Sequence, residues 1–134
     1  MTLRYLLDTN ICIYIAKRKP LTASQKLEKM EIGEVAMSAI TYGELLFGAE
    51  KSQQPVKTKK ILEELITLIP PLELTLETCE HYANIRAVLE KQGKSIGNND
   101  LWIASHALAL DAILVTNNMK EFSRVPNLKL ENWA

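Results

Sequence analysis

The chain has 134 residues, of which 47% are hydrophobic and 24% are charged, a composition typical of a single compact globular domain over residues 1–134. Sixteen basic and sixteen acidic residues cancel, which excludes a uniformly basic nucleic-acid-binding protein and leaves only local basic clusters for such a role. The first apolar run is too short for a signal peptide and no stretch reaches the length of a membrane span, so we expect a cytoplasmic protein.

The first element along the chain is a short, mainly apolar strand within residues 3–7 that leads directly into Asp8. Such a strand is typical of the centre of a parallel sheet. Thr9 and Asn10 are residues that favour helix starts, and residues 11–17 can continue as a helix. Since ligands of α/β proteins bind beyond the carboxyl ends of the strands, Asp8 is a candidate site residue. The alternative is that Asp8 only caps the following helix.

The remaining elements alternate between helix and strand. We predict helices at 21–30, at 40–49, after Pro55 with an apolar stripe at 61–69, from 75 or 78 to 91, and at 100–110. We predict strands at 34–38, 72–74, 112–116 and 128–130. Strands that alternate with helices indicate an α/β protein with a parallel sheet covered on both faces. The strand at 112–116 should be central and the last one should lie at an edge. The helix at 100–110 is apolar on nearly all sides, so it should be buried.

Three acidic residues stand out because they lie in apolar company at places that can face one edge of the sheet. Asp8 follows the first strand, Glu44 lies in the first turns of a helix, and Asp100 opens the buried helix. Bringing like charges out of water costs several kcal/mol per ion, and a divalent cation is the usual compensation. Mg²⁺ and Mn²⁺ prefer carboxylate and water ligands. Alternatively, Glu44 complements a helix dipole and Asp100 caps its helix, although Asn98 and Asn99 can also cap.

The segments around these acids resemble those of PIN-domain ribonucleases of the VapC toxin type, the toxic half of bacterial type II toxin–antitoxin pairs. The matching segments are LLDTNI (6–11), SAITYGEL (38–45), IGNNDLWIA (96–104), LVTNN (114–118), and EFSRVP (121–126) with LENW (130–133). Each segment alone is a weak signal, but together, in this order and spacing, they cover the chain from end to end and are specific.

The resemblance implies a PIN fold, which is a three-layer α/β/α sandwich on a central parallel sheet of about five strands. It implies an endoribonuclease that depends on Mg²⁺ or Mn²⁺ and inhibits translation, with Asp8, Glu44 and Asp100 as the metal-binding catalytic acids. The implied substrate is structured RNA, above all the anticodon stem–loop of initiator tRNA. The implied partners are a second copy of the chain in a homodimer and a VapB-type antitoxin, through which operator DNA is contacted only indirectly.

The resemblance also assigns supporting residues. By position, Thr9, Asn10 and Thr116 would be polar groups that support the acids. Many PIN domains carry a fourth acid just after the fourth strand, where this chain has Asn118. Either that neutral amide or Glu121, one helical turn further on, would complete the site, and Glu121 is the favoured fourth metal-binding residue.

Local basic clusters would guide the RNA backbone. The candidates are Lys17, Arg18, Lys19, Lys91 and Lys94, with Arg86 and Lys51 as further possibilities. The alternative is that they are ordinary solvated surface residues. The apolar stripes at 42–47 and 61–69 would form either core packing or the groove that receives an antitoxin helix.

Other residue types point away from rival functions. His81 and His106 lie on separate predicted helices without the spacing of metal ligands, so we interpret them as ordinary packed or surface residues. Their positions also disfavour a metal-free nuclease that works through two histidines. Cys12 and Cys79 should be buried thiols in a reducing compartment, and Trp102 should belong to the core or to a dimer interface. A phospho-receiver domain would need an acceptor Asp at the end of a central strand and a Lys after the last strand, and neither is evident. A catalytically weak or inactive PIN protein, acting as a regulatory dimer that binds antitoxin and operator, remains the alternative function.

Overall fold

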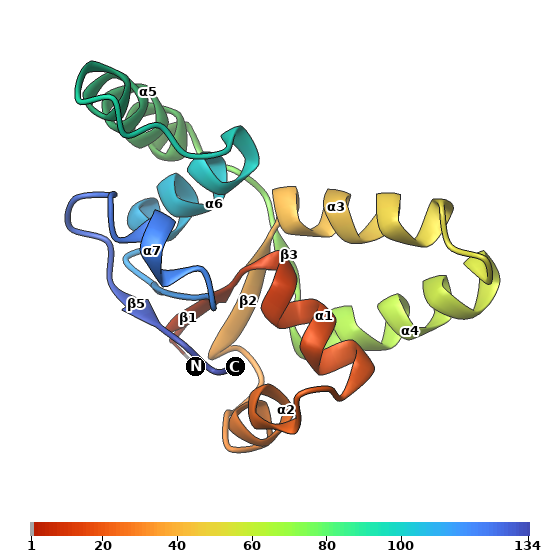
Figure 1. Ribbon diagram of the computed structural model, residues 1–134. Helices are drawn as coiled ribbons and strands as arrows, with labels where there is room; N and C mark the ends of the chain where they lie inside the picture. The colour runs from red at the N-terminus through yellow and green to blue at the C-terminus, as the bar shows by residue number, and fades with distance from the viewer. Residues whose placement is uncertain (1) are drawn as a thin grey trace.

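Five parallel strands form one central sheet in the computed structural model, which describes residues 2–134 (Figure 1). The strands are β1 (Tyr5–Leu7), β2 (Val35–Ser38), β3 (Pro71–Leu72), β4 (Ile113–Val115) and β5 (Leu130–Glu131). The helices are α1 (Thr9–Lys17), α2 (Leu21–Glu28), α3 (Ala39–Glu50), α4 (Pro55–Leu68), α5 (Leu76–Lys91), α6 (Asn98–Ala109) and α7 (Met119–Phe122). The strand order is β3-β2-β1-β4-β5, so β1 is central and β5 lies at an edge, while β4 is an inner strand as predicted.

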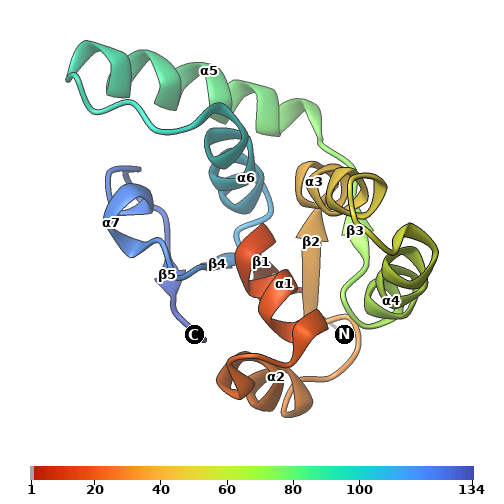
Figure 2. The same ribbon diagram turned by 45° about the vertical axis from the view of Figure 1, so that its right-hand side comes forward.

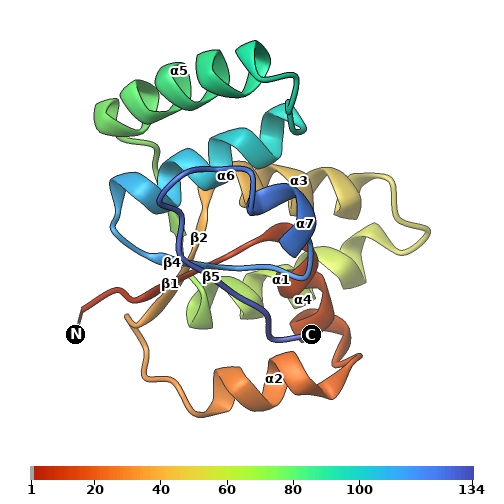
Figure 3. The same cartoon turned by 60° about the vertical axis from the view of Figure 1, so that its left-hand side comes forward.

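Successive side chains of the central strands point to opposite faces of the sheet, and each face has its own hydrophobic core. Leu7 of β1 packs in one core with residues of α1, α2 and α4, whereas its neighbour Leu6 packs in the other with residues of α5, α6 and α7. The same alternation holds in β4, where Val115 faces the first core and Leu114 the second. Helices therefore cover both faces of the sheet, as Figures 2 and 3 show, and the predicted three-layer α/β/α sandwich is confirmed.

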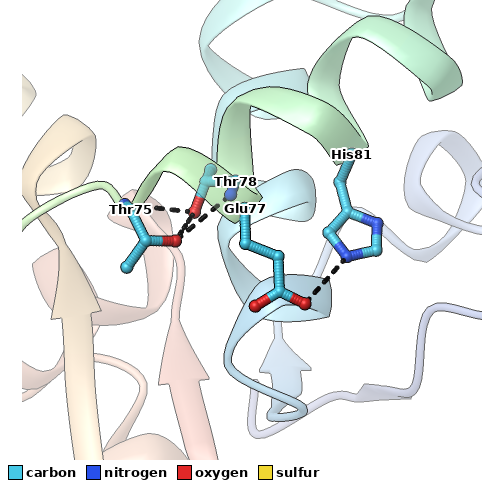
Figure 4. A network of polar contacts seen from close by, with 4 residues as sticks. All are labelled: Thr75, Glu77, Thr78 and His81. Atoms are coloured by element: carbon cyan, nitrogen blue, oxygen red, sulfur yellow. Dashed lines mark hydrogen bonds and ion pairs between the residues drawn. The ribbon is translucent and has the colours of Figure 1, made fainter.

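Helix α5 begins at a capping box. Thr75 Oγ1 accepts a hydrogen bond from the Thr78 backbone N–H at 3.1 Å, and the Thr75 backbone N–H approaches Thr78 Oγ1 at 3.4 Å (Figure 4). One turn on, Glu77 and His81 lie 3.8 Å apart on the exposed side of the helix. Of the two predicted helix starts, Thr75 is therefore the correct one. The capped helix packs along α6, which carries Asp100.

Several predicted boundaries were wrong by a few residues. The third strand occupies Pro71–Leu72 at the edge of the sheet. Proline has no backbone N–H to donate, and an edge strand tolerates this because it pairs with a neighbouring strand on one side only. Helix α6 starts at Asn98 with Gly97 at its N-cap, so neither Asn98 nor Asn99 caps it. Asp100 lies at the third helical position. The fifth strand is Leu130–Glu131 rather than 128–130, because its register with Leu114 and Val115 begins there.

The two cysteines differ in burial. Cys12 is buried as predicted, but the prediction for Cys79 was wrong because its side chain is exposed. The inward face of α5 is formed by Thr78, Ile85 and Leu89, and Cys79 is one residue, about 100° of helical rotation, away from it. No helix within residues 2–134 is long and apolar enough to cross a membrane.

Candidate metal and RNA-processing site

Asp8 lies at the carboxyl end of the central strand, where its backbone N–H donates to the Val115 carbonyl of β4 at 2.9 Å. Its carboxylate accepts a hydrogen bond from the Ile11 N–H at 3.0 Å, so Asp8 does cap α1. The residue is only 4% exposed. Burial raises the pKa of Asp8 and the charge of Glu44 adds to this, while a hydrogen bond with the Thr116 side chain acts in the opposite direction. The cap alone does not explain this burial, since a solvent-exposed Asp would cap equally well.

Glu44 reaches the same edge from α3, the helix that follows β2. One of its oxygens, Oε1, accepts a hydrogen bond from Thr9 Oγ1 at 2.6 Å. The other, Oε2, lies 3.4 Å from the Asn99 amide nitrogen on α6. The buried Thr41 hydroxyl lies 3.3 Å from that of Thr9. These contacts hold the Glu44 carboxylate between the starts of α1 and α6.

Asp100 completes the group from the first turn of α6 and is half-buried. Burial, the largest cause, and the negative charges of Asp8, Glu121 and Glu44, in that order of importance, together raise the pKa of Asp100 to about 6. All three charged side chains that shift this pKa are acids. The three predicted acids, and Glu121, therefore share one electrostatic field at the carboxyl edge of the sheet.

The place where many PIN domains carry a fourth acid is occupied here by two residues, Asn118 and Glu121, that hydrogen-bond to each other. Thr116, which is fully buried at the end of β4, accepts a hydrogen bond from the Asn118 N–H at 2.9 Å. The Asn118 side-chain amide donates to Glu121 Oε2 at 2.6 Å. The two sequence-based alternatives for this position are thus adjacent groups in one turn. Asn10, by contrast, is exposed and contributes its backbone N–H to Asp8.

The side-chain types of the candidate site suit a small hard cation, but their spacing does not make a complete set of ligands. The side-chain donors are carboxylate oxygens, which Mg²⁺ and Mn²⁺ prefer, and their mutual repulsion is what such an ion relieves. Among residues 2–134, no three His, Cys, Asp or Glu side chains lie close enough together to hold one ion as a complete set. Mg²⁺ is usually bound through one or two carboxylates and keeps several waters, so this arrangement is compatible with it.

The predicted RNA-guiding residues do not form one cluster. Lys17, Arg18 and Lys19 are exposed at the far end of α1, a helix of nine residues that spans roughly 13 Å from Asp8. Lys91 is exposed as the last residue of α5, and Lys94 is exposed in the connection from α5 to α6.

The two further basic candidates already have partners. The Arg86 guanidinium donates to Glu90 at 2.8 Å and to the Tyr82 hydroxyl at 2.7 Å. Lys51 lies 5.0 Å from the centre of the Phe47 ring. Trp102, predicted in a core or interface, is half-buried and stacks on Tyr82 with ring centroids 3.7 Å apart.

Some supporting residues were missed by sequence reasoning. Thr41 lies three residues before Glu44 and so shares its helical face, a spacing that could have identified it. Asn99 directly precedes Asp100. His106 is fully buried, with Nδ1 2.9 Å from Ser38 Oγ, the cap of α3. Burial lowers the pKa of His106. No local pattern links His106 to Ser38, which is 68 residues away.

An apolar groove adjoins the acids. It lies between α1, α3 and α4, has a volume of about 480 Å³, and includes Glu44 in its lining. Its apolar lining includes Ile13, Leu45, Ala49, Ile61, Leu62 and Leu65. The exposed Phe47 ring lies on α3 with Lys51 over it. The stripes at 42–47 and 61–69 thus contribute both to core packing and to an open groove.

Comparison with known proteins agrees with this geometry. The PIN domain family matches residues 5–128. Ribonuclease VapC2 of Haemophilus influenzae is 44% identical over 132 residues, which cover 98% of this chain and 99% of that protein. The tRNA(fMet)-specific endonuclease VapC of Shigella flexneri is 39% identical over 98% of this chain and 99% of that protein.

A solved structure shows the same fold. The crystal structure of VapBC2 from Rickettsia felis, bound to a DNA fragment from its promoter, includes a chain that is 40% identical to this one. The two superpose with a TM-score of 0.90 over 98% of this chain and 100% of that one. The match of the family model to most of the chain and the full-length similarity to VapC ribonucleases lead to one conclusion: the chain belongs to the PIN-domain family, among its VapC ribonucleases.

Proposed function

We propose that this chain is the toxin of a toxin–antitoxin pair, a Mg²⁺- or Mn²⁺-dependent endoribonuclease that acts in the cytoplasm and inhibits translation. The observation that carries the proposal is the group of four acids, Asp8, Glu44, Asp100 and Glu121, whose charges act on one another at the carboxyl edge of the sheet. Such repulsion is costly for a fold with no use for it, and it is relieved when a divalent cation binds, which can then also attract an RNA phosphate.

Each acid has a role that follows from its surroundings. Asp8 is the most buried and is oriented by Ile11 and by Thr116, so it is the most rigid ligand. Asp100 is half-buried and can contact both an ion and solvent. Glu44 is held by the Thr9 hydroxyl at 2.6 Å, which keeps one oxygen occupied and leaves the other directed toward α6.

The residues of the chain prepare the site for hydrolysis of a phosphodiester. When bound, a divalent ion would supply Lewis-acid stabilisation of the developing charge and would lower the pKa of a water. The carboxylates would orient that water by accepting hydrogen bonds from it, since ionised acids are hydrogen-bond acceptors only. Thr9 and Asn99 keep Glu44 in place, and Lys91 and Lys94 would attract the RNA backbone toward Asp100.

The proposed substrate is structured RNA, and most of all the anticodon stem–loop of initiator tRNA. The support for this is the similarity to the tRNA(fMet)-specific endonuclease VapC of Shigella flexneri over nearly the full length of both chains. Cleavage of purified initiator and elongator methionine tRNAs, with ends mapped by primer extension, tests the proposal. Equal cleavage of both tRNAs would contradict initiator specificity while leaving the nuclease activity in place.

The proposed partner is a VapB-type antitoxin, as in the VapBC complexes to which this fold is similar. The apolar groove between α1, α3 and α4 is suited to an amphipathic antitoxin helix, and Glu44 in its lining connects it to the acids. Operator DNA would be contacted through the antitoxin. Substituting Ile61→Glu should prevent capture of the antitoxin and leave RNA cleavage unchanged. Retained capture would place the antitoxin elsewhere.

We also propose a homodimer. The support for a homodimer is the resemblance to VapC proteins, and Leu76 at the start of α5, which is 85% exposed, is an apolar side chain that can be substituted to test it. Light scattering coupled to size-exclusion chromatography should give twice the chain mass, and Leu76→Glu should lower it. A monomer at all concentrations would contradict this part of the proposal.

A further inference from the structure

A chain of hydrogen bonds on the exposed side of α5 joins this helix to the start of α6. The Arg86 guanidinium donates to Glu90 Oε2 at 2.8 Å and to the Tyr82 hydroxyl at 2.7 Å. The Tyr82 hydroxyl in turn donates to Asn98 Oδ1 at 2.6 Å, and the Tyr82 ring stacks on Trp102 with an interplanar angle of 9°. Exposed ion pairs are often held loosely, but here a stacked aromatic ring fixes the middle of the chain.

A small pocket lies against these residues. It has a volume of about 220 Å³, and its polar lining consists of Arg86, Glu90, Ser95 and Asn98. Its apolar lining includes Leu89 and Leu101, both of which are buried. We call it the α5–α6 pocket. Pockets for drug-sized ligands have volumes of about 300–1,000 Å³, so this one suits a single smaller group.

The polar lining of the α5–α6 pocket offers both donors and an acceptor. The chain of hydrogen bonds uses one oxygen of Glu90, two nitrogens of Arg86 and the side-chain oxygen of Asn98. Within residues 2–134, this leaves Glu90 Oε1 as an acceptor, with Arg86 Nη2 and Asn98 Nδ2 as donors. A phosphodiester matches this set poorly, because it has no proton to donate and the Glu90 carboxylate repels it.

The α5–α6 pocket and the candidate acids share the segment that begins α6. Asn98, which lines the pocket, follows Gly97, and a Cβ atom added at Gly97 would lie 3.8 Å from Asp100 Oδ2. The next residue, Asn99, has its amide nitrogen 3.4 Å from Glu44 Oε2. Two residues of α-helix advance only about 3 Å, so Asn98 and Asp100 lie within one turn of each other. The pocket is therefore beside Asp100, where a nucleotide next to the scissile phosphate would pass.

We infer that the α5–α6 pocket binds one unpaired RNA base next to the scissile phosphate and thereby contributes to sequence specificity. The inference rests on the proposed nuclease function, but not on how the acids hold a cation. The edge of a base presents acceptors beside donors, which match the free groups of Arg86 and Glu90, and apolar side chains suit its flat face. Sequence-specific recognition of RNA mostly targets unpaired bases, whose edges are accessible.

A synthetic stem–loop RNA that spans a cleavage site mapped in bacterial RNA provides the test. The value of kcat/KM is measured for the intact RNA and for RNAs with an abasic nucleotide on either side of the cut. Glu90→Gln keeps the size of the side chain but replaces one acceptor with a donor. We expect a loss of about 10-fold on the intact RNA and of less than about 2-fold on one abasic RNA, where the base contact is already absent.

A second variant and a control accompany Glu90→Gln. Arg86→Gln removes the guanidinium donors, and we expect it to discriminate between the intact and abasic RNAs in the same way. Glu77→Gln is the matched control, because Glu77 is an exposed acid on the same helix that lies 3.8 Å from His81, and neither residue lines the pocket. Melting temperatures verify that each variant is folded.

The outcomes separate this inference from the proposed function. If the unaltered protein cleaves the RNA but Glu90→Gln and Arg86→Gln behave like Glu77→Gln, the inference is wrong and the nuclease remains. Equal losses on intact and abasic RNAs would also overturn it, because the two residues would then act on the RNA backbone or on the fold and not on a base. If the unaltered protein cleaves no RNA, the proposed function fails and the inference fails with it.

Discussion

Replacing Asp100 with asparagine is expected to stabilise the metal-free protein while it abolishes RNA cleavage. Burial and the charges of Asp8, Glu121 and Glu44 raise the pKa of Asp100 from 3.8 to about 6. At about 1.36 kcal/mol per pKa unit, this rise corresponds to an upper bound of about 3 kcal/mol in the free energy of unfolding at neutral pH. Since Asp100 is only half-buried and solvent screens its interactions, we expect a gain of about 1–2 kcal/mol.

The same substitution should change the pH dependence of stability. The folded protein binds the Asp100 proton more tightly than the unfolded chain does, so the free energy of unfolding falls as the pH rises from about 4 to about 6. Asp100→Asn removes that part of the decline. Urea denaturation in EDTA at about pH 4 and about pH 7.5 measures both effects. A variant that is less stable than the unaltered protein at the higher pH, with an unchanged pH dependence, would refute the reasoning.

Three further substitutions test other contacts. Thr9→Val removes the 2.6 Å hydrogen bond to Glu44, and single-turnover cleavage should slow by about 10–100-fold with little change in melting temperature. His106→Ala should lower the free energy of unfolding by about 2–3 kcal/mol, measured by urea denaturation, because it leaves a cavity in the core and removes the hydrogen bond between His106 and Ser38. Lys94→Glu should weaken RNA binding and reduce the slope of log affinity against log salt by about 1, measured by fluorescence anisotropy.

The candidate acids could be identified in the sequence because they lie at the ends of apolar segments. Asp8 interrupts an apolar run at a strand end, and Asp100 opens an apolar helix. In a parallel sheet such positions meet at one edge, and in the structure the charges of Asp8 and Glu44 do act on Asp100, although no three acids within residues 2–134 lie close enough to hold one ion. The alternation of helices and strands likewise predicted the layers, because burial on both faces of a short strand leaves few other arrangements.

Other features depend on contacts that local sequence does not encode. The pairing of His106 with Ser38 joins residues far apart in the chain, and the amide of Asn118 could only be assigned to Glu121 once the turn was folded. Cys79 was misplaced because a cysteine among apolar residues does not by itself indicate which side of a helix is buried. Helix ends shifted by one or two residues where glycine, and not a polar side chain, occupies the cap.

The groove and the acid cluster share Glu44, which has a functional consequence. An antitoxin segment that occupies the groove would lie next to the Glu44 carboxylate and to Thr9, which orients it. Inhibition would then need no conformational change in the sheet, since the inhibitor would compete directly with the RNA or with the cation. Inhibition that persists when the groove is blocked by Ile61→Glu would contradict this interpretation.

The most direct test of the central claim is cleavage of total bacterial RNA by the purified, antitoxin-free protein with Mg²⁺, with Mn²⁺ and with EDTA. Asp8→Asn serves as the control for contaminating ribonuclease, because it keeps the size of the side chain that caps α1 and removes its charge. A discrete fragment formed only by the unaltered protein with a divalent ion is the predicted result. No cleavage by well-folded protein with either metal would contradict the account and favour a regulatory dimer without catalytic turnover.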